Sequence, residues 1–502
     1  MSVDTNNAAF QDALNLIQYT RQSVFLTGKA GTGKSTFLRY VCEHTKKKHV
    51  VLAPTGIAAI NAGGSTMHSF FKLPFYPLLP DDPNLSLQRG RIHEFFKYTK
   101  PHRKLLEQIE LVIIDEISMV RADLIDAIDR ILRVYSHNLR EPFGGKQLLL
   151  VGDVFQLEPV VKNDEREILN RAYPTPYFFS ARVFSQIDLV SIELQKVYRQ
   201  TDSVFVSVLD HIRTNTAGAA DLQLLNTRYG SHIEESEADM YITLATRRDT
   251  VDSINEKKLA ELAGEPITFE GSIEGDFPES SLPTSQELVL KPGAQIIFIK
   301  NDFDRRWVNG TIGVIAGIDE EEETIYVITD DGKECDVKRE SWRNIRYRYN
   351  EKTKEIEEEV LGSFTQYPIR LAWAITVHKS QGLTFSRVVI DFTGGVFAGG
   401  QAYVALSRCT SLDGIQLKKP INRAEIVNFA GRFNDRQAID KALKQAQADV
   451  QYAAAARAFD KGDMEECLEQ FFRAIHSRYD IEKPVPRRLI RRKLGIINTL
   501  QE

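Results

Sequence analysis

Short apolar runs recur along the chain and are separated by stretches of helix-forming composition. Residues 24–27, 111–114, 148–151 and 242–245 are each short and mostly apolar. A continuous apolar run of this length is typical of a parallel strand buried on both faces, because helices cover both sides of such a sheet. The pattern therefore predicts an α/β protein built on parallel sheets.

A different pattern begins near residue 290. Short β-rich runs at residues 294–299, 311–315 and 324–328 are separated by turn signals such as Asn309-Gly310 and Asp331-Gly332. Several short strands at this spacing favour a small barrel. We therefore expect residues 290–360 to form an inserted β-barrel.

The last part of the chain has a helical pattern. Residues 448–478 read as two amphipathic helices joined by the turn Lys461-Gly462-Asp463, which is the form of one tetratricopeptide-like unit. A lone unit cannot bury both of its faces, so it either docks on the rest of the chain or is the first of several units. We expect residues 432–502 to be a C-terminal helical extension with a protein partner of its own.

Composition excludes several classes of protein. With 502 residues, 42% of them hydrophobic, the chain is long enough for three or four domains with separate cores. No apolar stretch approaches the roughly 18 residues needed to cross a bilayer, and the N-terminus lacks the pattern of a secretory signal. The four cysteines are scattered without a C-x-x-C pair, which argues against zinc, disulfides and an iron–sulfur cluster. These features predict a cytoplasmic protein without membrane contact.

The net charge of −5 is a sum over the whole chain and does not exclude a nucleic-acid partner. Acidic residues are concentrated at 319–323 and 355–359, within the expected barrel, so the rest of the chain is closer to neutral. Local basic residues can then line a channel for a nucleic-acid strand.

A phosphate-binding loop follows the first apolar run. Residues 28–35 read Gly-Lys-Ala-Gly-Thr-Gly-Lys-Ser, which fits the pattern G-x-x-x-x-G-K-[ST], and residues 36–41 have helix-forming composition. Backbone N–H groups of such a loop surround a triphosphate at the N-terminus of a helix. Lys34 is expected to reach the β- and γ-phosphates, and Ser35 to coordinate Mg²⁺. The sequence thus predicts a nucleoside-triphosphate site.

Polar residues follow the next two apolar runs. Asp115-Glu116 closes the run at 111–114, and Gln156 lies shortly after the run at 148–151. Ligands bind beyond the carboxyl ends of parallel strands, so these side chains should face the phosphates. Asp115 is expected to hold Mg²⁺ through its water shell, and Glu116 to orient and deprotonate the attacking water. Gln156 is the candidate sensor of the γ-phosphate.

This series of segments resembles the superfamily-one DNA helicases of the B subclass, the group of RecD and the Pif-one helicases. The resemblance covers about residues 8–430. Residues 53–59 and 65–71 look like the two family segments that hold the DNA backbone, and Gln11, with Phe10 beside it, lies where these helicases read adenine. Residues 116–124, Glu-Ile-Ser-Met-Val-Arg-Ala-Asp-Leu, are close to the signature of the Pif-one branch.

Later segments complete the resemblance and imply two arginine fingers. Residues 197–200 resemble the segment that carries the first finger, Arg199, and residues 403–408 the segment that carries the second, Arg408. A guanidinium group from the opposite lobe neutralises γ-phosphate charge only when the cleft is shut, which couples hydrolysis to closure. Residues 374–382 match a segment that touches both DNA and nucleotide.

Motifs and resemblance together assign a set of site residues. The expected catalytic residues are Lys34, Asp115, Glu116, Gln156, Arg199 and Arg408. The expected ATP contacts are Phe10, Gln11, Gly28, Gly31, Thr32, Gly33, Lys34, Ser35, Thr36, Gln156, Arg199, Gly382 and Arg408, and the Mg²⁺ ligands are Ser35 and Asp115. The expected DNA contacts are Pro54, Thr55, Gly56, His68, Phe70, Thr246, Arg247, His378, Lys379 and Ser380.

The resemblance also implies the domain organisation, with two RecA-like parallel-sheet motor lobes. The first lobe is expected at residues 1–180, with a small insertion at 72–104 that faces the DNA fork. The second lobe is expected at 181–289 and 361–431, on either side of an SH3-like barrel at 290–360.

The implied function is that of an ATP- and Mg²⁺-dependent DNA helicase. Such an enzyme moves 5′ to 3′ on single-stranded DNA and opens duplexes, forks and, in this family, G-quadruplexes, with roles in DNA repair, recombination and replication. The implied active form is a monomer, located at the nucleoid of a bacterial cytoplasm, or in the nucleus or mitochondrion of a eukaryote. Two alternatives remain: an ATPase that clamps or remodels nucleic acid without unwinding it, and an RNA helicase, because the motifs do not report 2′-hydroxyl selectivity.

Overall fold

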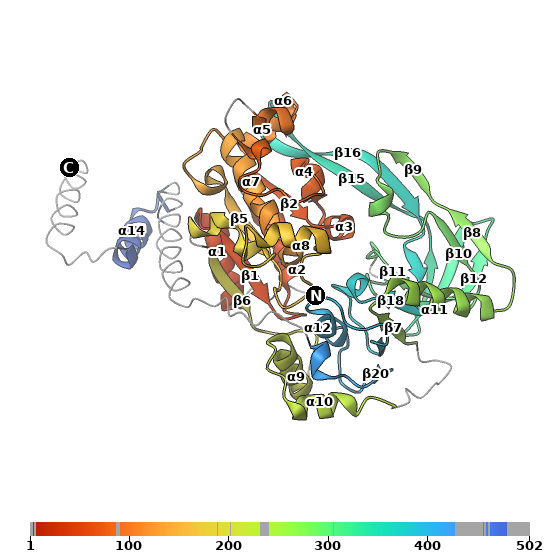
Figure 1. The fold of residues 1–502 in the computed structure, drawn as a ribbon. Helices are drawn as coiled ribbons and strands as arrows, with labels where there is room; N and C mark the ends of the chain where they lie inside the picture. The colour runs from red at the N-terminus through yellow and green to blue at the C-terminus, as the bar shows by residue number, and fades with distance from the viewer. Residues whose placement is uncertain are drawn as a thin grey trace, which may run out of the picture.

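The first lobe is a parallel sheet covered by helices. The structure is a computed structural model, and it describes residues 4, 7–86, 91–187, 189–200, 202–230, 240–304, 306–426, 455, 458–459 and 462–478. Six described strands form one sheet in the order β3-β2-β4-β5-β1-β6 (Figure 1), and every neighbouring pair in it is parallel. Its strands are β1 (Val24–Gly28), β2 (His49–Ala53), β3 (Ser65–Thr66), β4 (Leu111–Ile114), β5 (Gln147–Val151) and β6 (Val190–Leu194).

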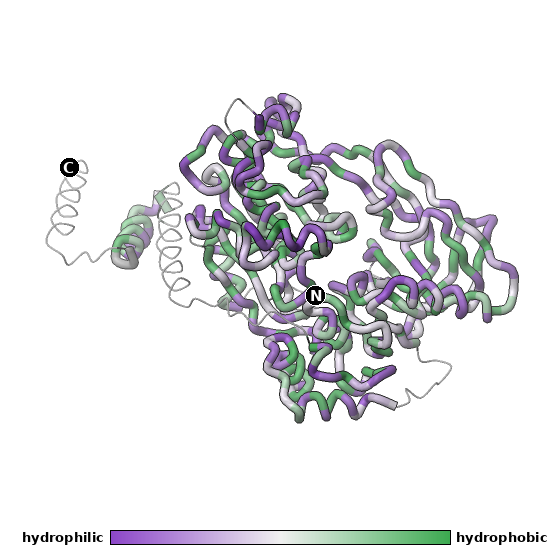
Figure 2. Tube along the Cα trace, in the orientation of Figure 1, coloured by the Kyte–Doolittle hydropathy of each residue, from purple (hydrophilic) through white to green (hydrophobic). Residues whose placement is uncertain are grey.

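The apolar runs of the sequence lie in the middle of this sheet. Every residue of β1, β4 and β5 is buried, and Figure 2 draws the strands of this sheet largely in hydrophobic colours. The helices of the lobe are α1 (Ala8–Tyr19), α2 (Lys34–His44), α3 (Gly56–Ala62), α4 (Met67–Phe71), α5 (Arg91–Phe95), α6 (Lys100–Gln108), α7 (Ala122–Tyr135) and α8 (Asn163–Asn170). The prediction of a parallel sheet is therefore confirmed. The predicted end of the lobe at residue 180 is too early, because β6 extends the sheet to Leu194.

The second lobe contains a second parallel sheet. Four described strands lie in the order β18-β7-β19-β20, and all of their pairings are parallel. The strands are β7 (Ile242–Ala245), β18 (Ala374–Thr376), β19 (Val388–Asp391) and β20 (Ile415–Leu417), and the helices are α9 (Ser203–Arg213), α10 (Ala219–Asn226), α11 (Arg248–Glu261) and α12 (Gln401–Leu406). Residues of α9, α10 and α12 share one hydrophobic core with β7 and β19. This arrangement matches the two-lobe prediction.

An antiparallel insertion separates β7 from β18, and it is larger than predicted. It consists of a five-stranded sheet in the order β14-β13-β12-β11-β17, a three-stranded sheet β15-β16-β9 and the pair β10-β8. The strands are β8 (Ile267–Glu270), β9 (Ser272–Gly275), β10 (Glu287–Leu290), β11 (Gln295–Phe298), β12 (Ile312–Asp319), β13 (Thr324–Thr329), β14 (Glu334–Val337), β15 (Glu340–Asn350), β16 (Glu355–Gln366) and β17 (Ile369–Leu371). Among these strands β14 and β17 are the edges of their sheet, so a closed barrel at 290–360 is not confirmed.

Strands β15 and β16 form an arm that reaches the first lobe. Figure 1 shows the pair running from the inserted sheets toward α6. Tyr347 Oη of β15 accepts a hydrogen bond of 3.3 Å from the Val51 N–H of β2, and Ile345, Tyr347 and Tyr349 join the hydrophobic core of the first lobe. Ile297 and Ile312 of the insertion also join the hydrophobic core of the second lobe, so the insertion packs on both lobes.

Of the C-terminal extension expected at residues 432–502, the structure describes mainly helix α14 (Met464–Arg478). This helix agrees with the second helix predicted for residues 448–478, while the first predicted helix lies mostly outside the described residues. No helix in the described part of the chain is long and apolar enough to cross a membrane.

Candidate active site and nucleic-acid groove

The phosphate-binding loop joins β1 to α2, as the motif requires. Gly31 and Gly33 have φ angles of +79° and +88°, a left-handed conformation that glycine adopts without steric cost. Lys34 lies at the start of α2, and its Nζ donates to the carbonyl oxygens of Gly28 and Lys29 at 2.7 and 3.0 Å. Burial lowers the pKa of Lys34, while the nearby carboxylates Asp153 and Glu116 act in the opposite direction.

The acid pair lies directly after β4. The carboxylate of Asp115 accepts a 2.9 Å hydrogen bond from the Glu116 N–H, and Glu116 has φ +50°, an uncommon backbone conformation for a non-glycine residue. Burial and then the charge of Asp115 raise the pKa of Glu116 to about 7, and burial also raises the pKa of Asp115. A carboxylate with a pKa near 7 is suited to accept a proton from water at neutral pH.

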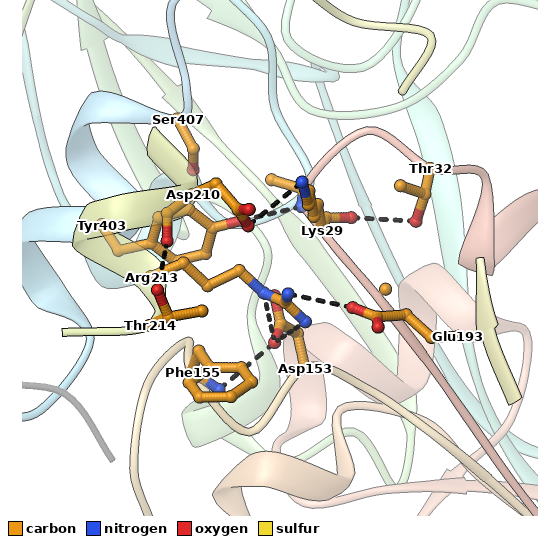
Figure 3. A network of polar contacts seen from close by, with 12 residues as sticks. Lys29, Thr32, Asp153, Phe155, Glu193, Asp210, Arg213, Thr214, Tyr403 and Ser407 are labelled. Atoms are coloured by element: carbon orange, nitrogen blue, oxygen red, sulfur yellow. Dashed lines mark hydrogen bonds and ion pairs between the residues drawn. The ribbon is translucent and has the colours of Figure 1, made fainter. Parts of the chain in front are cut away.

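Residues that follow β5 form the other wall of the site. Asp153 is fully buried and pairs with Arg213, whose Nε lies 3.2 Å from a carboxylate oxygen of Asp153. The same guanidinium group contacts Glu193 at 2.9 Å and stacks on the Phe155 ring at 4.5 Å. Figure 3 shows Arg213 between these acids. Gln156 is also buried, and its role as the sensor of the γ-phosphate stays a prediction.

Two contacts join the phosphate-binding loop to the second lobe. Tyr403 Oη of α12 accepts a 3.0 Å hydrogen bond from the Ala30 N–H, and Lys29 Nζ lies 3.1 Å from a carboxylate oxygen of Asp210 in α9. Both contacts are visible in Figure 3. The sequence prediction omitted Tyr403, Asp210 and Arg213, because each acts across the lobe boundary. Tyr403 belongs to a segment matched to the family, which is the one signal that pointed to it.

The two candidate arginine fingers lie close to this cleft. Arg199 comes from the connection after β6, and its Nη1 donates to the Ser407 carbonyl oxygen at 3.1 Å. Arg408 is only 1% exposed, and its Nε donates to the Val404 carbonyl oxygen at 2.9 Å. Burial lowers the pKa of Arg408 to about 9 and that of Arg199 to about 10, and in Arg408 the charge of Arg199 adds to the effect. The half-buried Arg199 and the fully buried Arg408 are thus two cations held near each other, an arrangement that an anion between them would stabilise.

The remaining expected ATP contacts differ in how they are placed. Gly28, Thr32, Ser35 and Thr36 lie in the phosphate-binding loop or at the start of α2, and the Gly382 carbonyl oxygen accepts from Arg199 Nη2 at 3.4 Å. Phe10 is instead a core residue, with its ring packed edge-on against Phe37 at 4.8 Å. Gln11 lies on the same helix, and its contact with adenine stays a prediction.

The expected DNA contacts of the first lobe lie around α3 and α4. Thr55 follows Pro54 and caps α3, because its Oγ1 accepts from the Ala58 N–H at 3.2 Å. Gly56 faces the insertion, where a Cβ on it would lie 2.4 Å from Ser281 Oγ. His68 is half-buried and stacks on Phe75. Phe70 was expected to touch DNA, but it is buried against Phe71 and has a packing role.

The expected DNA contacts of the second lobe line one open groove of about 650 Å³. Its lining comprises Thr246, Arg247, Arg248, Asp249, Thr376, His378, Lys379 and Phe397. Arg247 Nε donates to the Gly394 carbonyl oxygen at 3.1 Å, which fixes its stem at the groove. Ser380 does not line the groove: it is buried, and its hydroxyl donates to the Val377 carbonyl oxygen at 2.7 Å. Arg248 and Phe397 were not predicted.

The signature segment at 116–124 holds the insertion of the first lobe in place. Arg121 pairs with Asp123 at 2.9 Å and with Glu165 at 3.3 Å, and all three side chains are largely buried. Asp123 Oδ2 also accepts a hydrogen bond of 3.0 Å from the Leu78 N–H, in the expected fork-facing insertion. A buried ion pair of this kind fixes geometry more than it adds stability.

The chain is similar to known DNA helicases in sequence and in structure. A family model described as PIF1-like helicase matches residues 4–217. The chain is 33% identical over 435 residues to the ATP-dependent DNA helicase Pif1 of Campylobacter jejuni, covering 83% of this chain and 92% of that protein. It resembles the crystal structure of Bacteroides sp Pif1 in complex with ADP-AlF4, with a TM-score of 0.77 and 40% identity over 88% of this chain and 96% of that one. The crystal structure of Bacteroides Pif1 bound to ssDNA is also similar, with a TM-score of 0.59, 40% identity and the same coverage of 88% and 96%.

Proposed function

The chain belongs to the PIF1-like helicase family, and we propose on this basis that it is an ATP-dependent DNA helicase. It moves 5′ to 3′ along single-stranded DNA and separates the duplex ahead of it. The observation that carries the proposal is the convergence of Lys34, Glu116 and Arg408 at the cleft between two parallel-sheet lobes.

The residues present fit a nucleoside triphosphate with Mg²⁺. The left-handed glycines turn the loop between β1 and α2 so that its N–H groups are available to phosphate oxygens. Ser35 and Asp115 would hold the ion, which when bound neutralises charge on the phosphates. The half-buried Lys34 and Arg199 and the buried Arg408, whose pKa values are lowered, gain stability as cations beside the polyphosphate.

Glu116 and the two arginines have different roles in hydrolysis. Glu116 as a carboxylate takes a proton from the attacking water, and Asp115 fixes its backbone through the 2.9 Å hydrogen bond. Arg199 and Arg408 stabilise charge on the γ-phosphoryl oxygens, and such groups are worth roughly 10³–10⁵ in rate. Arg408 belongs to the second lobe and Arg199 to the chain between the lobes, so hydrolysis depends on lobe closure.

Single-stranded DNA follows the groove that contains Arg247 and Lys379, and the N-terminal end of α3 near Thr55. Contacts there are made with the phosphate backbone, so affinity falls with salt and depends little on sequence. Forked DNA and G-quadruplexes are further substrates, and the fork-facing insertion held by Asp123 meets the duplex.

We further propose that the active form is a monomer, that α14 belongs to a segment that binds a protein partner, and that the enzyme works with chromosomal DNA inside the cell in repair and recombination. The monomeric state and the cellular role rest on the family relationship, and the partner of the α14 segment rests on the sequence pattern of a lone helical unit that cannot bury both of its faces.

The rate of ATP hydrolysis with and without a thymine oligonucleotide tests the proposal. Wild-type protein should hydrolyse ATP much faster when the DNA is present. Lys34→Ala should abolish hydrolysis while the protein still binds the oligonucleotide without nucleotide, because Lys34 acts on the phosphates alone. Lys46→Ala, an exposed lysine beyond the other end of α2, is the matched control and should behave as wild type. DNA-stimulated hydrolysis by Lys34→Ala would refute the site.

A further inference from the structure

Each lobe carries one histidine stacked on one exposed phenylalanine. In the first lobe the rings of His68 and Phe75 are nearly parallel, with centroids 5.0 Å apart and an interplanar angle of 11°. In the second lobe His378 and Phe397 are arranged in the same way, at 6.4 Å and 19°. The two pairs are called the ring platforms below.

The ring platforms occupy equivalent positions in the two sheets. His68 lies on α4 immediately after β3, which is an edge of the first sheet. His378 lies shortly after β18, which is an edge of the second sheet. The carboxyl ends of parallel strands are where such sheets bind their ligands, so both platforms lie where a ligand is expected.

Both phenylalanines are exposed although the chain holds them firmly. Phe75 is 82% exposed and Phe397 is 64% exposed. The N–H groups of Phe397 and Ala398 donate to Oε1 of the buried Gln401 at 3.1 and 3.3 Å. Close to Phe75, the Leu78 N–H donates to the buried Asp123 at 3.0 Å. Each ring is thus presented to solvent on an anchored segment.

The partner histidines support the rings without adding positive charge. Burial lowers the pKa of His378, and burial together with the charge of Arg121 lowers the pKa of His68. A neutral imidazole is a flat surface on which an aromatic ring stacks. Positive charge in the second lobe comes instead from Arg247, Arg248 and Lys379, which line the same groove as Phe397.

We propose that Phe75 and Phe397 stack on nucleobases of the bound single strand, one in each lobe, and that His68 and His378 orient the two rings. A groove that combines cations with an exposed aromatic ring matches a nucleic-acid strand, because the cations meet phosphates and the ring meets a base. A proteinaceous partner would leave the cations of the groove without phosphates to neutralise them. The inference rests on the proposed function, and it adds base-stacking residues to the backbone contacts of the DNA site.

Binding to normal and abasic DNA tests this inference. Affinities of wild type, Phe75→Ala and Phe397→Ala are measured for a thymine oligonucleotide and for an abasic strand of the same length. Each alanine variant should lose roughly 5- to 150-fold in affinity for the thymine strand, which corresponds to about 1–3 kcal/mol per stacked base. On the abasic strand both variants should match wild type, because phosphate contacts are intact. Phe397→Trp should keep the affinity for the thymine strand.

Phe303→Ala is the matched control. Phe303 is 96% exposed like the two platform rings, but it lies between β11 and β12 and does not line the groove. Replacing Phe303 by alanine should change neither the affinity for the thymine strand nor the affinity for the abasic strand.

Equal loss on both strands, or no loss on either, would overturn the assignment of stacking. The wild-type measurement distinguishes a failure of the stacking proposal from a failure of the proposed function. If wild-type protein binds neither strand, DNA binding itself is refuted. The slope of log affinity against log salt is a second readout, and it should be the same in wild type and both alanine variants, since stacking releases no counterions.

Discussion

Glu116 has both a strained backbone conformation and a raised pKa. Its φ of +50° directs the side chain away from the path of β4, and local strain of this kind is concentrated at functional sites. Burial raises its pKa to about 7. The residue pattern alone predicted the base, but neither the strain nor the pKa, because both depend on neighbours from other strands.

The raised pKa has a consequence for the pH dependence of hydrolysis. Glu116 is active only as a carboxylate, so kcat/KM for ATP in the presence of DNA should fall as the pH drops through about 7, approaching tenfold per unit well below that value. Steady-state measurements of kcat/KM from about pH 5.5 to 8.5 test this pH dependence. A rate that does not change between about pH 6 and 8 would show that another group is the base.

At the scale of helices and strands, some strands could be predicted from the sequence and others could not. The runs that became β4 and β7 were recognised because they are mostly apolar, as befits strands that lie inside their sheets. The acidic run at 355–359 was placed within the expected barrel but was not predicted as a strand, and it begins β16. Its glutamates face arginines of β15, such as Arg346, which pairs with Glu359 at 2.8 Å. A charge run does not reveal a strand unless the partner strand is known.

The start of helix α12 meets the segment that follows β5 so closely that a glycine is required there. Gly400 precedes α12 with φ +82°, and a Cβ on it would lie 1.9 Å from the Gln156 carbonyl oxygen. Gly400→Ala should therefore hold the lobes apart and lower DNA-stimulated ATP turnover by about tenfold or more, since each ~1.4 kcal/mol lost from the closed state is tenfold. Binding of single-stranded DNA should change little.

Gly395→Ala is the control for this variant. Gly395 has φ +79°, so its replacement introduces the same backbone strain, but a Cβ there meets nothing within 4 Å. Turnover should be near normal in Gly395→Ala and low in Gly400→Ala. Similar turnover in the two variants would show that the close approach has no role in closure.

Across the whole molecule, the lobes are joined by charges that no local pattern identifies. Arg213 of α9 pairs with Asp153 of the first lobe, and the Asp153 side chain is completely buried. The contact joins residues far apart in the sequence, so no motif predicts it. The closure of the SH3-like barrel is not confirmed, and strand runs in a sequence show that sheets exist but not whether they close.

Removing Arg213 should leave a buried carboxylate without a partner. Arg213→Met should lower the free energy of unfolding by about 3–5 kcal/mol. Adding Asp153→Asn should restore part of that loss, because the unpaired charge is then removed. Chemical denaturation of wild type, both single variants and the double variant measures the coupling. Strictly additive effects of the two substitutions would contradict the pairing.

Strand displacement decides whether the whole assembly is a 5′-to-3′ DNA helicase. Wild-type protein with ATP and Mg²⁺ is given DNA duplexes with a single 5′ or 3′ overhang and RNA duplexes of the same sequence, and Glu116→Gln serves as the inactive control. We expect unwinding of the 5′-overhang DNA, little unwinding of the other three substrates, and none by Glu116→Gln. DNA-stimulated hydrolysis without displacement of any strand, or preferential unwinding of RNA or of the 3′-overhang duplex, would contradict the assignment.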